Sequence, residues 1–151
     1  MLIDVHAHLD SKEFSQDLNE VVNRARSRLN CIICNGTNKE SNKKILELTK
    51  KYSIIKAALG LYPLDAENLT EKQIEKEFEF IKAHKKEIVA LGEIGLDFKY
   101  GKNKELQIQV FNDFIKLGKK LNLPLIIHSR GAELEVIEIL EENNFSNAIL
   151  H

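Results

Sequence analysis

The stretch Ile88–His128, IVALGEIGLDFKYGKNKELQIQVFNDFIKLGKKLNLPLIIH, contains one complete strand–helix–strand pattern. It begins with a short apolar run, Ile88–Leu91, of the length expected for a buried strand. Apolar residues then recur at helical spacing, at Leu106, Val110, Phe114, Leu117 and Leu121. Pro124 precedes a second apolar run, Leu125–Ile127. The stretch therefore predicts two strands joined by a covering helix.

The same alternation continues on both sides of this stretch. Further strands are predicted at Leu2–Val5, Cys31–Cys34, Ile54–Leu59 and Ala148–Leu150. Amphipathic helices are predicted between them, the first along an apolar stripe from Phe14 to Leu29. Repeated strand–helix alternation predicts an α/β fold with parallel strands. A doubly wound sheet and a (β/α)8 barrel both fit this pattern. Glycine-rich phosphate-binding motifs are absent, which disfavours a nucleotide-binding protein.

Composition limits the class of protein. The 151 residues are 43% hydrophobic and 30% charged, as in ordinary globular domains. The formal net charge of −1 provides no general basic field, so a nucleic acid would have to be bound by local contacts. No apolar run reaches the length of a membrane span, and Asp4 and His6 interrupt the N-terminus where a signal peptide would be apolar. We expect a cytoplasmic protein with no membrane association and no stable protein partner.

The two cysteines, Cys31 and Cys34, lie within a predicted strand. No second pair is present to complete a zinc site, so we interpret both as small core residues.

Residues that commonly bind metals follow four of the predicted strands. His6 and His8 end the first strand, Glu93 follows the fourth, His128 the fifth and His151 the sixth. In β/α barrels the C-terminal ends of the strands carry the active site. His6 and His8 are two residues apart, which places both side chains on one side of a strand. Four imidazoles and a carboxylate are a donor set for two divalent ions bridged by the carboxylate, and they suit zinc, manganese or nickel better than magnesium.

Three segments carry a resemblance to a known family. Ile3–Asp10 (IDVHAHLD) resembles the opening of TatD-type deoxyribonucleases, Leu91–Phe98 (LGEIGLDF) their second signature, and Leu123–Arg130 (LPLIIHSR) their third. Ile149-Leu150-His151 is similar to the start of the next block. The resemblance extends in order over the whole sequence.

The resemblance implies a TIM (β/α)8 barrel and metal-dependent hydrolysis of DNA by a metal-activated water. It assigns His6 and His8 to one ion, His128 and His151 to a second, and Glu93 to the bridge. The two ions would be divalent: zinc, manganese, nickel or magnesium.

Residues beyond the ligands also receive expected roles from the resemblance. Arg130 is expected to contact a phosphate, and Asp4 and Asp97 to orient ligands or to form ordinary structural contacts. Tyr62 is a further expected substrate contact, although the family commonly has histidine at this position, in Gly-x-His-Pro, where this chain has Gly60-Leu61-Tyr62-Pro63.

The resemblance also predicts what residues 1–151 lack. They form a single domain with about six of the eight strands, without strands seven and eight and without the late catalytic aspartate of the family. We therefore expect this stretch to be inactive by itself. Two other functions remain open: an amidohydrolase-type enzyme acting on a small amide or phosphoester, and a metal-binding remnant without turnover.

Overall fold

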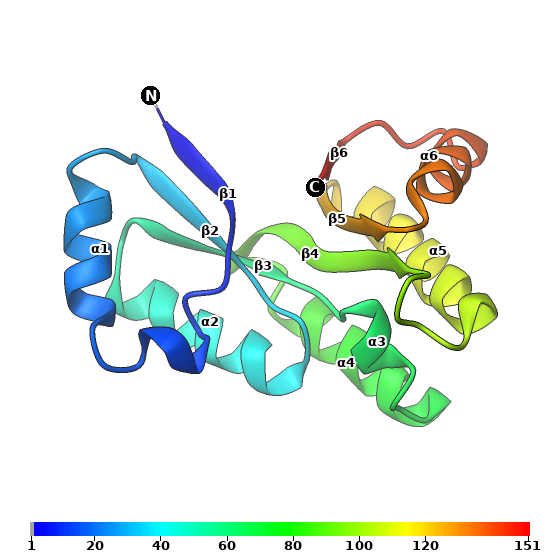
Figure 1. Cartoon of the computed structure of the whole chain (residues 1–151), viewed down its shortest axis with the longest axis horizontal. Helices are drawn as coiled ribbons and strands as arrows, with labels where there is room; N and C mark the ends of the chain where they lie inside the picture. Colours follow the sequence, from blue (N-terminus) through cyan, green and yellow to red (C-terminus); the bar gives the residue numbers. More distant parts are fainter. Residues whose placement is uncertain (1) are drawn as a thin grey trace.

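The computed structural model describes residues 2–151, which form one curled, six-stranded parallel sheet. The strands are β1 (Ile3–Ala7), β2 (Cys31–Asn35), β3 (Ile55–Leu59), β4 (Ile88–Asp97), β5 (Leu125–Arg130) and β6 (Ala148–Leu150). The helices are α1 (Leu18–Arg26), α2 (Lys39–Lys51), α3 (Pro63–Ala66), α4 (Glu71–Ala83), α5 (Lys104–Leu121) and α6 (Glu133–Glu142), with a 3-10 turn at Lys12–Phe14. Figure 1 shows each helix connecting one strand to the next.

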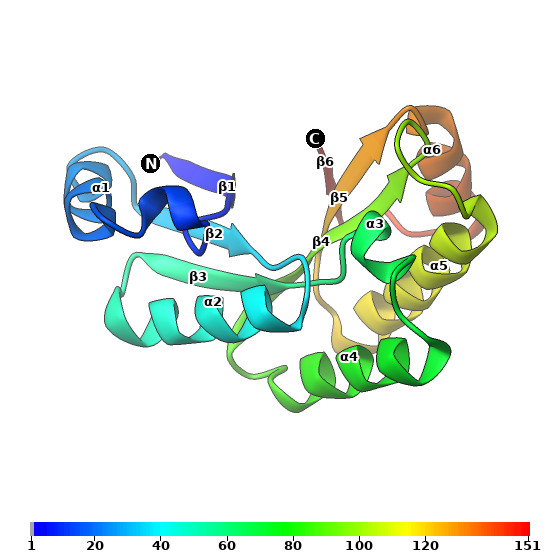
Figure 2. The same cartoon turned by 60° about the horizontal axis from the view of Figure 1, so that its bottom comes forward.

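The order of the strands distinguishes between the two architectures that the sequence allowed. Neighbouring strands follow sequence order, β1-β2-β3-β4-β5-β6. A doubly wound sheet would reverse its strand order at a switch point, whereas a barrel keeps it. The sheet curves into a trough with the helices on its outer side, and the two ends of the chain face each other across the opening (Figure 2). The fold is that of a partial TIM barrel.

Side-chain alternation along the strands explains the two faces of the sheet. On β3, Ile55, Ala57 and Leu59 pack into the large core beneath the helices. Ala58 points to the other face, where it joins a small cluster with Ala90 of β4 and Ile126 of β5. The concave face therefore has only a thin apolar layer, while the main core lies between the sheet and its helices.

Several boundaries differ from the sequence prediction; β1 continues to Ala7 and β5 to Arg130, for example. The first helix begins at Leu18 and not near Phe14, because Lys12–Phe14 forms a separate 3-10 turn. Strand β4 continues beyond Leu91 to Asp97, where Ile94 pairs with Ile127 and Asp97 pairs with Arg130 of β5. Glycine and, to a lesser degree, glutamate are disfavoured in strands, but pairing with β5 keeps this segment extended.

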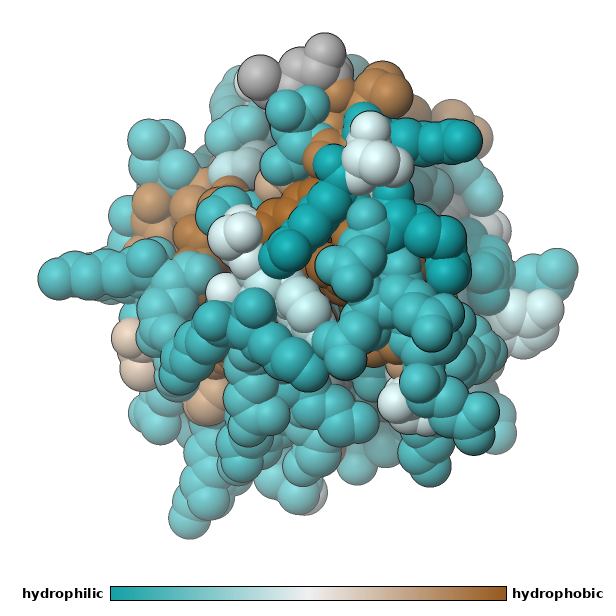
Figure 3. Space-filling model, turned by 90° about the vertical axis from the view of Figure 1, so that its left-hand side faces the viewer, coloured by the Kyte–Doolittle hydropathy of each residue, from teal (hydrophilic) through white to brown (hydrophobic). Residues whose placement is uncertain are grey.

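The outermost strands of the described sheet, β1 and β6, each have one unpaired edge. Leu2 and Ile3 are 64% and 50% exposed at one edge, and Leu150 is 49% exposed at the other. Figure 3 views the side that carries α1, where a hydrophobic area gathers in the upper half of a mainly hydrophilic surface. Among residues 2–151, no helix combines the length and apolar character needed to cross a membrane.

Candidate metal centre

Glu93 on β4 lies at the centre of the candidate site. Its side chain is only 6% exposed, and both carboxylate oxygens face imidazole nitrogens. Oε2 lies 3.6 Å from His6 Nε2 and 3.1 Å from His8 Nε2. Oε1 lies 3.0 Å from His128 Nδ1 and 3.2 Å from His151 Nε2. The carboxylate therefore separates two pairs of imidazoles, one from β1 and its end, the other from the ends of β5 and β6.

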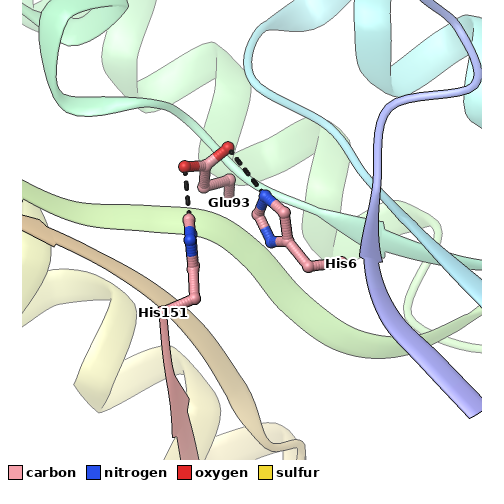
Figure 4. Close-up of side chains that lie close together, drawn as sticks. All are labelled: His6, Glu93 and His151. Atoms are coloured by element: carbon pink, nitrogen blue, oxygen red, sulfur yellow. Dashed lines mark ion pairs between the residues drawn. The ribbon is translucent and has the colours of Figure 1, made fainter.

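The predicted meeting of the five side chains at the C-terminal ends of the strands is present in the structure. Figure 4 shows Glu93 between His6, which reaches in from β1, and His151, which follows β6. One ligand atom from each of these three residues lies within 4.8 Å of the others. His128 reaches the same face because it is two residues after Ile126 on β5.

The backbone around Glu93 is tightly packed. The Glu93 N–H donates to the carbonyl of Gly36 at 2.8 Å, and the peptide bond between Gly92 and Glu93 is cis. A Cβ atom at Gly60 would lie 2.4 Å from the Glu93 carbonyl oxygen and 2.7 Å from its nitrogen. Gly60 is itself held by the buried Asn42 amide, which contacts both its N–H and its carbonyl. A side chain at residue 60 would collide with the Glu93 backbone, so only glycine allows the end of β3 to lie this close to β4.

Two of the imidazoles are oriented by a contact at the ring nitrogen that points away from Glu93. His8 Nδ1 lies 2.8 Å from the backbone carbonyl of Asn35, so Nε2 is the nitrogen that faces Glu93. His128 Nε2 lies 3.2 Å from Asp97 Oδ2, so Nδ1 faces Glu93. Metal-bound histidines in proteins usually donate their second N–H in this way, to a carbonyl or a carboxylate.

Charges in the site favour an anionic Glu93 and a neutral His6. Burial opposes ionisation of Glu93, but hydrogen bonds from His128, His151 and His8 outweigh it, so the pKa of Glu93 lies far below its usual value. Burial lowers the pKa of His6 to about 4, against the opposing effect of Glu93. The neutral His6 ring therefore has one unprotonated nitrogen at neutral pH, and this nitrogen can bind a metal ion. The hydrogen bond to Glu93 raises the pKa of His8.

These residues fit divalent metal ions. His6 Nε2 and His8 Nε2 lie 3.0 Å apart and face the same carboxylate oxygen. The buried His6 Nδ1 has no hydrogen-bond partner among the described residues. A divalent ion beside these two nitrogens would accept a lone pair from each ring. Nitrogen donors with one shared carboxylate match the preferences of zinc, manganese and nickel.

Asp97 is buried at the end of β4 and connects several other predicted residues. Its Oδ2 accepts a hydrogen bond from the Tyr62 hydroxyl at 2.9 Å and lies 3.8 Å from Arg130 Nη1. The Tyr62 hydroxyl is also 3.1 Å from His128 Nε2. Tyr62 therefore contacts the residues behind the metal centre. It also lines, with Arg130, an open cavity of about 460 Å³ above Glu93.

Asp4 makes a structural contact, which is one of the two alternatives that the sequence left open: its Oδ1 accepts the backbone N–H of His6. The remaining histidine, His84, is half-buried against Phe80, with ring centroids 4.3 Å apart and Nδ1 2.8 Å from the Phe80 carbonyl. Of the two cysteines, Cys34 is buried and Cys31 is only partly so.

Sequence reasoning also missed residues at the site. Asn35, whose carbonyl orients His8, ends β2. Applying the strand-end rule to this strand as well would have identified it. Asp10, Thr37 and Asp65 line the cavity. Asp10 ends the first family-like segment but was given no role, and Thr37 and Asp65 come from a loop and a short helix that carried no sequence signal.

A partial β/α barrel with an imidazole-rich, carboxylate-centred site at the C-terminal ends of its strands defines a class, the metal-dependent hydrolases of barrel fold. Comparison with known proteins specifies the family. Residues 3–151 match the family model described as TatD related DNase. The chain is 40% identical over 144 residues to an uncharacterized metal-dependent hydrolase of Bacillus subtilis, YabD, covering 94% of this chain and 56% of that protein.

Two further comparisons agree. The chain is 31% identical over 163 residues to the human deoxyribonuclease TATDN3, covering 99% of this chain and 60% of that protein. The crystal structure of the TatD homologue YJJV from Escherichia coli superposes with a TM-score of 0.84 at 31% identity, covering 95% of this chain and 56% of that one. The chain belongs to the TatD family of metal-dependent hydrolases. It spans somewhat more than half the length of these relatives.

Proposed function

We propose that the protein hydrolyses phosphodiester bonds of DNA, at two divalent ions held by His6, His8, Glu93, His128 and His151. One observation carries this proposal: each oxygen of Glu93 faces its own pair of imidazoles, at 3.0 to 3.6 Å. A carboxylate that shares its two oxygens in this way has the arrangement of a bridge between ions about 3.5–4 Å apart. His6 and His8 belong to one ion position, and His128 and His151 to the other.

The residues of this chain would divide the work as follows. When bound, divalent ions lower the pKa of water to about 7 and neutralise charge on a phosphoryl oxygen. Glu93 supplies the shared negative charge, and Asp97 keeps His128 in the tautomer whose Nδ1 faces the centre. Arg130 lines the cavity and presents a guanidinium that suits a phosphate oxygen. The catalytic aspartate implied by the family resemblance lies on a later strand, so no catalytic base is assigned within residues 2–151.

DNA is proposed as the substrate on two grounds. The human relative at 31% identity is named a deoxyribonuclease. Arg130, partly exposed at the rim of the cavity, provides a local cation where the net charge of −1 provides no general one. The cytoplasmic location expected from the sequence stays a prediction.

The test uses the full-length protein with Glu93→Gln. We expect loss of one or both ions in metal analysis and loss of most hydrolysis of a labelled oligonucleotide, because an amide cannot supply the bridging charge. Glu138→Gln, at an exposed position of α6, is the matched control and should change neither. Full activity of Glu93→Gln with normal metal content would exclude the bridge. Hydrolysis of small amides but not of oligonucleotides would favour the amidohydrolase-type enzyme. Metal binding without any turnover would favour a metal-binding remnant that is not an enzyme.

A further inference from the structure

One buried amide, the side chain of Gln107 on α5, holds the backbone of Asp97. Its Oε1 accepts the Asp97 N–H at 2.8 Å, and its Nε2 donates to the Asp97 carbonyl at 3.2 Å. Nε2 also donates to Glu67 Oε1 at 2.7 Å. Gln107 is only 1% exposed, so bulk water does not compete for these hydrogen bonds. A single side chain therefore pairs both backbone polar groups of the residue that faces His128.

The Gln107 amide takes the place of a neighbouring strand. β3 ends at Leu59, which pairs with Leu91, whereas β4 continues to Asp97. The strand β3 therefore cannot pair with the backbone of Asp97. Gln107 supplies the acceptor and the donor that a strand residue would have supplied there.

The surroundings of the amide allow only one orientation. Oε1 faces a backbone donor, while Nε2 faces two acceptors, a carbonyl and a carboxylate. A reversed amide would place donor against donor and oxygen against oxygen. Gly101 leaves the room that the amide needs, because a Cβ atom there would lie 2.0 Å from Gln107 Nε2 and 2.4 Å from the Asp97 carbonyl oxygen. The contact between Gln107 and Asp97 is thus fixed in both chemistry and space.

The position of the Asp97 backbone determines where its carboxylate lies. Oδ2 accepts a hydrogen bond from the Tyr62 hydroxyl at 2.9 Å and lies 3.2 Å from His128 Nε2. A backbone shift of roughly 0.5 Å away from the ring would take this second contact out of hydrogen-bond range. His128 faces Glu93 through its other nitrogen, Nδ1, at 3.0 Å. An unbroken series of contacts therefore joins Gln107 to the candidate metal centre.

We propose that Gln107 is a positioning residue of the metal centre, which clamps the backbone of Asp97 and so holds the Asp97 carboxylate against His128. His128 Nδ1 then stays directed toward the centre. Gln107 lies outside the cavity above Glu93, and it acts on the centre only through Asp97. The inference rests on the proposed metal centre and adds to it a residue from the helical layer of the barrel.

The experiment measures zinc affinity of the full-length protein by competition with a chromogenic chelator at pH 7. Gln107→Met replaces the amide with an apolar chain of similar size. It should weaken zinc binding by about 10-fold, the lower end of the range for groups that orient a metal ligand. Gln109→Met makes the same substitution at an exposed position of α5 and should leave the affinity unchanged. Denaturant melts of the metal-free proteins measure stability separately.

A second background separates positioning from a structural role. Asp97→Ala removes the carboxylate but keeps the backbone groups that Gln107 holds. In this background Gln107→Met should still lower the denaturation midpoint, because the buried Asp97 N–H loses its acceptor. It should not weaken zinc binding any further, because the carboxylate through which Gln107 acts is absent.

A second variant keeps the test available if Gln107→Met does not fold. Gln107→Glu retains an acceptor for the Asp97 N–H but places an oxygen against the Asp97 carbonyl and the Glu67 carboxylate. It should therefore also weaken zinc binding. Combining it with Glu67→Gln returns a donor to the contact between residues 67 and 107, and part of the affinity should be recovered.

The outcomes separate this inference from the proposed function. If the wild-type protein binds zinc and hydrolyses oligonucleotides, but Gln107→Met or Gln107→Glu binds zinc as tightly as wild type, the positioning role is refuted and the hydrolase proposal stands. An equal loss of zinc affinity in the wild-type and Asp97→Ala backgrounds would also refute it, because Gln107 would not act through the carboxylate. If the wild-type protein binds no divalent ion, the proposed metal centre fails, and the role of Gln107 fails with it.

Discussion

Asp97→Asn tests how His128 is oriented in the candidate metal centre. The substitution keeps the size of a side chain that is fully buried and changes only its charge and one donor group. Oδ1 can still accept the Tyr100 N–H, but an amide nitrogen at the position of Oδ2 would face His128 Nε2 at 3.2 Å. Two N–H donors cannot face each other, so His128 is driven to the tautomer with its proton on Nδ1. That proton occupies the lone pair that faces Glu93.

The expected size follows from this change of tautomer. Loss of a group that orients a metal ligand typically lowers metal affinity by about 10- to 100-fold, or about 1.4 to 2.7 kcal/mol. The assay is competition with a chromogenic zinc chelator at pH 7, on the full-length protein. Asp113→Asn is the control, since it removes a surface carboxylate paired only with Lys116 at 2.8 Å on α5.

A double-mutant cycle tests whether Asp97 acts through His128. His128→Ala removes the ligand altogether, so Asp97→Asn should add little further loss in that background. An unchanged affinity for the single Asp97→Asn variant, or full additivity of the two substitutions, would show that Asp97 does not act through His128.

Two further predictions concern stability. Glu67→Gln should lower the free energy of unfolding by about 1–2 kcal/mol at pH 7, because the Glu67 carboxylate accepts two backbone N–H groups before α5. Burial opposes its ionisation, but these hydrogen bonds outweigh it and lower the pKa of Glu67. The stabilisation is therefore complete above the pKa of Glu67 in the unfolded chain, about 4.3, and is lost as the pH falls through its lower pKa in the folded protein. Denaturant melts of wild type and Glu67→Gln should therefore converge in acid. A difference in unfolding free energy that does not change with pH would contradict this. Gly60→Ala should cost about 1–3 kcal/mol in the same melts, since its methyl group would press on the Glu93 backbone, and an unchanged midpoint would mean that β3 and β4 can separate without penalty.

Much of the fold could be predicted from local pattern. The apolar run and helical spacing between Ile88 and Leu121 identified β4 and α5 because both elements bury one continuous face. The end of β4 could not be predicted in this way. Gly95 has a φ of 130°, a conformation that suits glycine, and the strand persists there only because β5 pairs with it. Such pairing joins residues far apart in the chain and leaves no local signal.

The candidate site could also be predicted in part from the sequence. His6, Glu93 and His128 were identified because strand ends in a parallel sheet meet at one edge. The contacts among Tyr62, Asp97 and His128 depend on side-chain directions in three separate elements. These side-chain directions depend on tertiary packing, so the contacts could not be predicted from the sequence.

His6 lies on β1 and His151 directly follows β6, so metal binding would be linked to folding. Both side chains reach Glu93 on β4, and a bound ion would therefore join three segments that are far apart in the sequence. A ligand that binds only the folded state stabilises it by about 1.4 kcal/mol for each tenfold excess over its dissociation constant. Removal of metal would then lower the free energy of unfolding before any substrate arrives, and the free ion concentration would set the fraction of protein that is folded.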